Sequence, residues 1–146
     1  MRVVWRNLTC YVDVLACVTG ADIVLDPAAM ISPAADHDPT GARAVNVGST
    51  ENIVRAIKAQ PVPDRIKLVY IGSVAMTGDR LYPIHVGRTG DPLKPSIYDA
   101  YACSKIAAEN LVAESGLKYW VSCRQTFIAV PNTLALMDPI MYHQPL

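Results

Sequence analysis

The sequence lacks the features that mark several classes of protein. Its four cysteines form no Cys-x-x-Cys pair, which argues against a zinc site or a redox motif. No apolar run approaches the ~18 residues that a membrane span needs, and the first residues show no secretory signal pattern. Lys and Arg total 13 and Asp and Glu total 13, so no basic field favours nucleic acid. These absences predict a cytoplasmic protein with free thiols and with no membrane or nucleic-acid partner.

Glycine is also missing where one kind of binding loop would need it. No Gly-x-Gly or Gly-x-x-Gly motif precedes Gly20, so the first part of the chain has no glycine-rich turn for a phosphate. The sequence has no internal repeat and no low-complexity segment. What it does have is 146 residues, 51% of them hydrophobic and 18% charged, which is typical of a single globular α/β domain.

Apolar runs and helical periods alternate along the chain. The run at 66–73 is almost continuously apolar, as is typical of parallel strands buried on both faces. Prolines mark 30–40 and 76–97 as loops, and the second is long enough to line a site. Strands are predicted at 3–5, 21–26, 66–73 and 119–124, and helices at 11–18, 42–59 and 98–115. This order predicts an α/β fold with a doubly wound parallel sheet.

One helix holds residues suited to acid/base chemistry. The segment 98–115 contains Tyr98, Tyr101 and Lys105. Positions four apart share a helix face, so Tyr101 rather than Tyr98 faces Lys105. An ammonium ~4 Å from a phenol, at an effective dielectric of about 20, stabilises the phenolate by on the order of 4 kcal/mol. The pair is therefore suited to act as a general base, although the same spacing also occurs on ordinary amphipathic helices.

A serine joins this pair through the expected topology. The predicted strand 66–73 ends at Ser73 and is followed by the loop 76–97 and then by the helix. In a parallel sheet, ligands bind beyond the carboxyl ends of the strands. We therefore expect the hydroxyl of Ser73, the phenol of Tyr101 and the ammonium of Lys105 to converge at this edge.

Several segments agree in type, order and separation with one known family. They are ADIVLDPAA (21–29), NVGSTENIVRAIKA (46–59), KLVYIGSVAMTG (67–78), YACSKIAAEN (101–110) and VSCRQTF (121–127). Together they resemble the extended short-chain dehydrogenase/reductase family, in its NAD-dependent epimerase/dehydratase group. The resemblance covers most of residues 4–130 and is far more specific than Tyr-x-x-x-Lys alone.

The resemblance implies catalytic roles for three residues. Ser73 corresponds to a hydroxyl that hydrogen-bonds the substrate oxygen. Tyr101 corresponds to the acid/base that exchanges the proton of a substrate hydroxyl during hydride transfer. Lys105 corresponds to the residue that binds the nicotinamide ribose and favours the phenolate. The implied cofactor is NAD or NADP, and the implied substrate is a nucleotide sugar or another small hydroxy or keto compound.

Further residues correspond to cofactor contacts. Asn7 and Leu8 stand where such proteins carry an Asp-hydrophobic pair at the adenine. Ala28 and Ala29 match small residues whose backbone passes close to the cofactor. Asn46 opens an Asn-x-x-Gly/Ser-Thr helix segment, and a structural role in tying loop backbone is at least as well supported as a catalytic one.

The sequence also departs from the family pattern. Asp26-Pro27 replaces a histidine and an apolar residue. Pro27 has no backbone donor, and Asp26 would add a negative charge near a dinucleotide phosphate, so both predict weaker cofactor binding. Beyond Arg124, Val130-Pro131 replaces a Gly-Pro turn.

Compared with the family, the chain corresponds to a central fragment. The first βαβ unit, with its Gly-x-x-Gly-x-x-Gly turn, and most of the substrate region have no counterpart. We expect 1–130 to be an incomplete NAD(P)-binding Rossmann-type domain and 131–146 to begin a truncated C-terminal substrate-binding region. In the strand order 3-2-1-4-5-6, the strand at 3–5 would have no neighbour and 21–26 would form an apolar edge. A truncated product and a partial record both remain open, and the isolated chain is expected to be inactive and of marginal stability.

The leading hypothesis is an NAD(P)-dependent epimerase/dehydratase-type oxidoreductase with Tyr101 as its acid/base. The alternative is a degenerate non-catalytic module that binds a nucleotide or dimerises; the resemblance implies a homodimer through helices 42–59 and 98–115. The stretch Asp-His-Asp around His37 is interpreted as a solvated loop, not a metal site.

Overall fold

The computed structural model describes residues 3–78 and 92–126 and contains a parallel sheet covered by helices. Its strands are β1 (Ile23–Asp26), β2 (Lys67–Ser73) and β3 (Trp120–Gln125), in the order β1-β2-β3. Both pairs run parallel, with Leu68 beside Val24 on one side and Trp120 on the other. The parallel α/β sheet predicted from 21–26, 66–73 and 119–124 is therefore confirmed.

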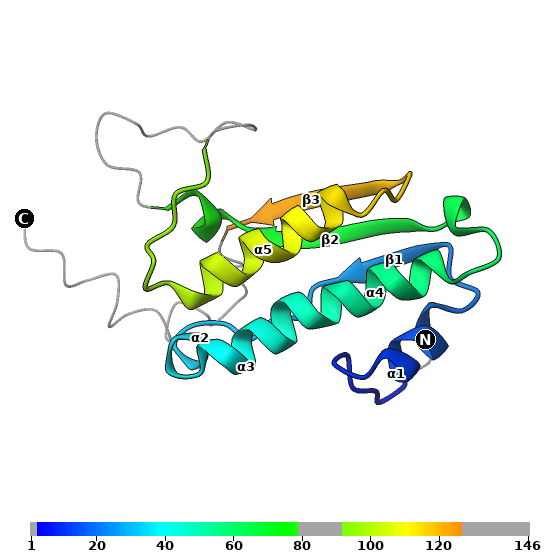
Figure 1. Ribbon diagram of the computed structural model, residues 1–146, viewed down its shortest axis with the longest axis horizontal. Helices are drawn as coiled ribbons and strands as arrows, with labels where there is room; N and C mark the ends of the chain where they lie inside the picture. The colour runs from blue at the N-terminus through cyan, green and yellow to red at the C-terminus, as the bar shows by residue number, and fades with distance from the viewer. Residues whose placement is uncertain (1–2, 79–91, 127–146) are drawn as a thin grey trace, which may run out of the picture.

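The helices alternate with the strands as the apolar periods predict. Because parallel neighbours need a crossover, α3 and α4 connect β1 to β2, and α5 connects β2 to β3 (Figure 1). The helices are α1 (Tyr11–Val18), α2 (Ala34–His37), α3 (Pro39–Arg43), the π-helical turn η1 (Ala44–Gly48), α4 (Ser49–Lys58), the 3₁₀ turns η2 (Pro63–Arg65) and η3 (Val74–Thr77), and α5 (Ala100–Glu114). Helix α5 begins two residues later than predicted, which leaves Tyr98 before it and 86% exposed.

The strand predicted at 3–5 is wrong. Residues 3–7 have no regular secondary structure, and Trp5 is 91% exposed. A strand is stable only when a neighbour satisfies its backbone N–H and C=O groups. In the described part of the chain the sheet contains β1, β2 and β3 and offers 3–5 no such neighbour. The apolar run at 3–5 therefore does not form the predicted strand.

The loop predicted at 30–40 is also wrong, because two short helices occupy much of it. Pro33 stands at the N-cap of α2 and Pro39 in the first turn of α3, a position where the missing N–H and fixed φ of proline are tolerated. Asp38 caps α3 by accepting a hydrogen bond from the Gly41 N–H at 2.8 Å. The prolines and aspartates that suggested a loop are helix-start signals here.

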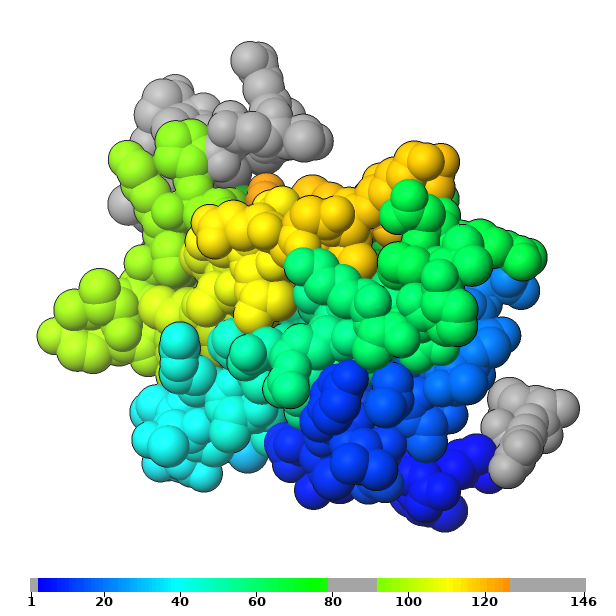
Figure 2. Space-filling model, turned by 45° about the vertical axis from the view of Figure 1, so that its right-hand side comes forward, coloured from blue at the N-terminus to red at the C-terminus, as the bar shows by residue number. Residues whose placement is uncertain are grey.

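The core lies between one face of the sheet and the helices. Leu68 and Tyr70 of β2 are fully buried and point to the same face, on alternate positions. They pack in one cluster with Val14 of α1, Ile57 of α4 and Val112 of α5. Helices α4 and α5 run side by side, and α1 packs against α4 (Figures 1 and 2).

The opposite face of the sheet is much less covered by the described residues. Ile23 and Leu25 of β1 are 61% and 64% exposed, and Val121 of β3 is 38% exposed. Val69 and Ile71 of β2 are half-buried. The expectation that 66–73 is buried on both faces is thus met fully on only one face.

Some predictions concern segments that lie outside the described residues. The site-lining loop 76–97 is described only at its two ends, and the predicted C-terminal region 131–146 and the Val130-Pro131 turn are not described. Within 3–78 and 92–126, no helix has both the length and the apolar character to cross a bilayer.

Candidate active site

The carboxyl end of β2 leads directly into the candidate site. Strand β2 ends at Ser73, whose backbone is extended and whose Oγ accepts a hydrogen bond from the Ala75 N–H at 3.2 Å. Ser73 therefore caps the 3₁₀ turn η3, and its own N–H donates to the Met76 sulfur at 3.4 Å. A hydroxyl has one donor and two acceptor sites, and no hydrogen bond found among the described residues uses the Ser73 O–H as a donor, so it can donate to another molecule.

Tyr101 and Lys105 lie one turn apart on α5, as the four-residue spacing predicts. Asp99 caps this helix by accepting from the Ala102 N–H at 2.7 Å, which fixes where the first turn begins. Tyr101 is half-buried, whereas Lys105 is only 2% exposed. The two side chains therefore share a helix face but differ in their access to solvent.

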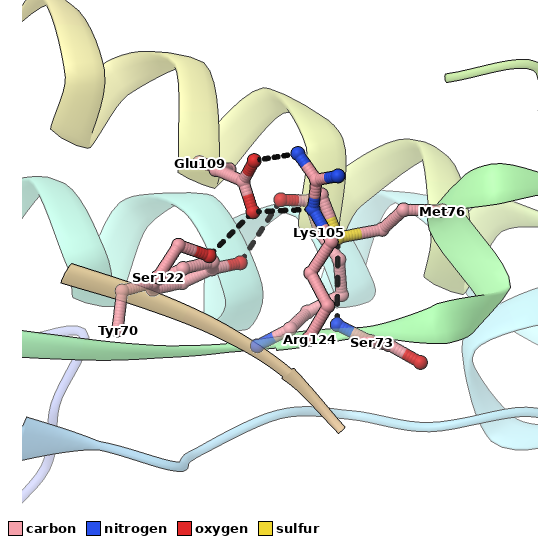
Figure 3. Close-up of polar contacts among 7 residues, drawn as sticks. All are labelled: Tyr70, Ser73, Met76, Lys105, Glu109, Ser122 and Arg124. Carbon is pink, nitrogen blue, oxygen red and sulfur yellow. Dashed lines mark hydrogen bonds and ion pairs between the residues drawn. The ribbon is translucent and has the colours of Figure 1, made fainter. Parts of the chain in front are cut away.

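The structure brings Ser73, Tyr101 and Lys105 to adjoining elements but does not join their side chains. Helix α5 packs against both β2 and η3. None of the hydrogen bonds found among the described residues connects the three side chains. In Figure 3 the hydroxyl of Ser73 points away from Lys105. Their convergence on a substrate stays a prediction.

Lys105 is buried against the core in an unusual setting for an ammonium. Its Nζ lies 4.5 Å from the centroid of the Tyr70 ring, a cation–π distance. Burial lowers the pKa of Lys105, while the negative charges of Asp26 and Glu109 act in the opposite direction. The Tyr70 hydroxyl donates to the Lys105 carbonyl oxygen at 2.9 Å, so β2 holds the helix backbone at the same residue.

Asp26 does not occupy the exposed position that its proposed effect on a phosphate would need. It is 2% exposed and lies under the helices, where its Oδ2 accepts from the Thr50 hydroxyl at 2.7 Å. Burial raises the pKa of Asp26, against the lowering effects of Thr50, the Lys105 charge and the Ala28 N–H. Its charge therefore acts on the interior of the fold and toward Lys105.

A second ionic group, formed by the buried Glu109 and the exposed Arg124, ties α5 to β3 (Figure 3). Glu109 accepts from Ser122 at 2.5 Å and from the Arg124 Nε at 3.2 Å, and forms a further close ion pair with the Arg124 guanidinium. Burial alone would raise the pKa of Glu109, but these hydrogen bonds and the charges of Arg124 and Lys105 hold the pKa below its usual value. Sequence reasoning missed this group, although Glu109 lies four residues beyond Lys105 on the same helix face.

Asn46 performs the structural role that was one of its two interpretations. Its Oδ1 accepts from the Met30 N–H at 2.6 Å, and its Nδ2 donates to the Met30 carbonyl at 3.0 Å and to the Ser104 Oγ at 2.8 Å. One side chain thus fixes both backbone groups of Met30 to α5. Ala28 and Ala29, the expected cofactor contacts, are half-buried and immediately precede this anchored residue.

Asn7 and Leu8 serve local structure before α1. The Asn7 Oδ1 accepts from the N–H and the hydroxyl of Thr9, at 3.0 and 2.8 Å, which is an Asx turn. The Leu8 carbonyl accepts from the Asn52 Nδ2 at 3.0 Å. These contacts attach the segment to α4, and the predicted contact with adenine stays a prediction.

With this arrangement established, comparison with known proteins decides the family. The model of the NAD dependent epimerase/dehydratase family matches residues 2–132. The chain belongs to this family. A curated relative, mouse (Mus musculus) 3 beta-hydroxysteroid dehydrogenase type 7, is 28% identical over 105 residues, which are 70% of this chain and 28% of the relative.

Solved structures agree with the fold of an epimerase/dehydratase family member. RMD from Pseudomonas aeruginosa, complexed with NADPH, has a TM-score of 0.73 at 23% identity over 84% of this chain and 42% of its own. UDP-glucose 4-epimerase from Thermus thermophilus, complexed with NAD, has a TM-score of 0.70 at 25% identity over 81% of this chain and 38% of its own. The chain thus spans less than half the length of each of these relatives.

The donor set at the carboxyl edge fits a nicotinamide cofactor of this family in chemical type. A phenol on Tyr101 and a hydroxyl on Ser73 suit a carbinol oxygen, and an ammonium on Lys105 suits ribose hydroxyls. Lys105 departs from an ideal fit because it is buried and faces Asp26. The residues therefore fit the cofactor in chemical type. The one departure is the burial of the Lys105 ammonium near the negative charge of Asp26.

Proposed function

We propose that this chain carries the acid/base residues of an NAD(P)-dependent oxidoreductase of the epimerase/dehydratase type. The reaction would be hydride transfer at a carbinol carbon. The observation that carries the proposal is the placement of Tyr101 and Lys105 one turn apart on α5, packed against the end of β2 where Ser73 lies. The family match over residues 2–132 supports the same reaction class.

Each of the three residues has a distinct role in this proposal. Tyr101, half-buried at the start of α5, exchanges the proton of the substrate hydroxyl. Ser73 donates its O–H to the substrate oxygen while its Oγ accepts from the Ala75 N–H of η3. Lys105 binds ribose hydroxyls and, as a cation one turn away, favours the phenolate form of Tyr101.

NAD or NADP is the proposed cofactor, with Ala28 and Ala29 beside it and Asn7 and Leu8 toward the adenine. When bound, it supplies the hydride acceptor or donor. Support comes from solved relatives that contain NADPH or NAD. The role of this chain's residues is to orient the ribose, exclude water and hold the proton at the Tyr101 oxygen.

A small hydroxy or keto compound is the proposed substrate. The relatives include a UDP-glucose 4-epimerase and a hydroxysteroid dehydrogenase, so a nucleotide sugar is one member of a wider class. Since the chain spans only 28% to 42% of these relatives, we propose that it does not turn over substrate by itself.

A non-catalytic nucleotide-binding or dimerisation module is the second candidate. One observation favours it: Asp26, which replaces the family's usual residue, places a buried carboxylate toward Lys105. The same candidate includes a homodimer through helices 42–59 and 98–115. Sedimentation over a range of protein concentrations tests it, and a monomer at every concentration would contradict the dimer.

Cofactor titration tests the main proposal. We expect NAD or NADP to raise the thermal unfolding midpoint of the full chain progressively as its concentration increases. Lys105→Met should remove this effect, while Lys58→Met, at an exposed position of α4, should retain it. Absence of stabilisation by both cofactors would contradict the proposal. Turnover by the full chain that Tyr101→Phe abolishes would contradict its proposed inactivity.

A further inference from the structure

One buried carboxylate has no role in the proposed chemistry. Asp26, at the end of β1, is 2% exposed. Its Oδ2 accepts from Thr50 and the Ala28 N–H also favours the charged carboxylate, but among the residues that the structure describes its Oδ1 is buried with no hydrogen-bond partner. A buried carboxylate is costly unless an opposite charge or hydrogen bonds compensate both oxygens. A cation near Asp26 would therefore stabilise its charged form.

The strand register places Asp26 beside the cation. Asp26 pairs with Tyr70 on the adjacent strand β2, and both side chains point to the face covered by helices. Neighbouring strands lie about 4.8 Å apart. The Lys105 Nζ lies 4.5 Å from the Tyr70 ring centroid. The ammonium therefore sits over the side chain next to Asp26.

The other carboxylate near Lys105 is already engaged. Glu109 receives hydrogen bonds from Ser122 and from two nitrogens of Arg124. Lys105 itself is 2% exposed, so bulk water compensates little of its charge. Of the two acidic groups that act on Lys105, Asp26 is thus the one with an oxygen still available.

We propose that Asp26 is the buried counter-ion of Lys105 and acts as a positioning residue. Its carboxylate keeps the Lys105 side chain protonated and in place over the Tyr70 ring. This inference rests on the proposed function in one respect only, namely the role of the Lys105 ammonium in binding ribose and favouring the Tyr101 phenolate. The pairing itself involves only residues of β1, β2 and α5, and the two groups act on each other through their charges rather than through a contact closer than 4.0 Å.

Titration of Lys105 in the full chain tests the pair directly. The ε-amine resonance of Lys105 is followed against pH by NMR and assigned by its loss in Lys105→Arg. In Asp26→Asn we expect the pKa of Lys105 to fall by about one pH unit, since a nearby opposite charge favours the charged form of a buried ammonium. The two proteins compared differ only at residue 26, so the other groups near Lys105, namely Glu109, Tyr70 and Tyr101, are present in both.

A matched control removes the same charge elsewhere. Asp22→Asn alters an exposed aspartate just before β1 and should leave the Lys105 titration where it is in the unsubstituted chain. An Asp26→Asn protein whose Lys105 titrates as in the Asp22→Asn protein would overturn the proposal. A lower pKa in Asp26→Asn alone supports it.

A rescue experiment covers the case in which Asp26→Asn does not fold. An unpaired buried ammonium would be the cause, so adding Lys105→Met should restore the fold. Restoration supports the ion pair, and a double variant that stays unfolded overturns it. None of these measurements needs a cofactor. A chain that binds neither NAD nor NADP would therefore count against the proposed function and leave the ion-pair result intact.

Discussion

The two faces of the three-stranded sheet differ sharply in what covers them. On the helix side, Leu68 and Tyr70 are fully buried and a layer of polar groups lies between β-sheet and helices. On the other side, Ile23 and Leu25 are more than 60% exposed. The same strands therefore contribute strongly to stability through one face and weakly through the other, within the described residues. Apolar sequence alone does not distinguish the faces.

The largest expected difference in the free energy of unfolding is between alanine substitutions of two leucines, which lie on adjacent strands and on opposite faces of the sheet. Leu68→Ala should lower the free energy of unfolding by about 3 kcal/mol, because it leaves a cavity in the core. Leu25→Ala should cost less than about 1 kcal/mol, since most of that side chain is already in solvent. Urea unfolding of the full chain measures both. Equal losses would show that the two faces are equally covered.

The next effect concerns the charged layer on the covered face. Glu109→Gln should lower the free energy of unfolding by about 2 kcal/mol at pH 7, because it removes a charge-assisted group from Arg124. Denaturation in urea at fixed pH provides the measurement. A much smaller cost would mean that the ion pair merely balances its own desolvation.

The stabilisation that Glu109→Gln removes should depend on pH. The pKa of Glu109 is held below its unfolded value of ~4.3. Its stabilisation is therefore present above that value and is lost as pH falls through the lower, folded pKa. We expect the stability gap between the unsubstituted chain and Glu109→Gln to narrow below about pH 4. A gap that stays constant down to pH 3 would contradict the shift.

A smaller effect compares neighbouring residues of β2. Tyr70→Phe removes the hydrogen bond to the Lys105 carbonyl and should cost about 1 kcal/mol. Val69→Thr, which has nearly the same shape and lies on the less covered face, should cost less than this. A larger loss of unfolding free energy in Val69→Thr than in Tyr70→Phe would contradict this, and would mean that the Val69 side chain is more deeply buried than its exposed fraction indicates.

The smallest effect on stability is expected from a polar substitution on the face that the described residues cover less. Leu25→Thr should change the free energy of unfolding by less than about 0.5 kcal/mol, because Leu25 is 64% exposed. It should also reduce self-association, since exposed apolar strand residues promote it. Light scattering at increasing concentration checks this, and unchanged scattering would exclude β1 as the associating surface.

Much of the fold was predictable because its strongest signals are local. The apolar run at 66–73 and the helix with Tyr101 and Lys105 follow from periodicity and cap residues. The run at 3–5 misled because a strand also requires a neighbour, which no short window of sequence reports. The segment 30–40 misled because Pro39 and Asp38 mark helix starts as well as loops.

The positions of the candidate site residues were predictable, but their surroundings were less so. Helical spacing identified Tyr101 and Lys105, and the end of β2 identified Ser73. The contacts of Asp26, Asn46 and Glu109 depend on side chains from elements far apart in sequence. Such pairings require the relative placement of α4, α5 and β3, which periodicity does not supply.

The π-helical turn between α3 and α4 has a consequence for engineering. Each residue of a helix turns the chain by about 100°, and a π turn holds one residue more than an α turn. Deleting one residue within Ala44–Gly48 would restore a regular helix but rotate everything before it by that angle. A deletion before Asn46 would turn Met30 away from it, and a deletion after Asn46 would turn its side chain away from Ser104. This segment should therefore accept substitutions more readily than changes in length.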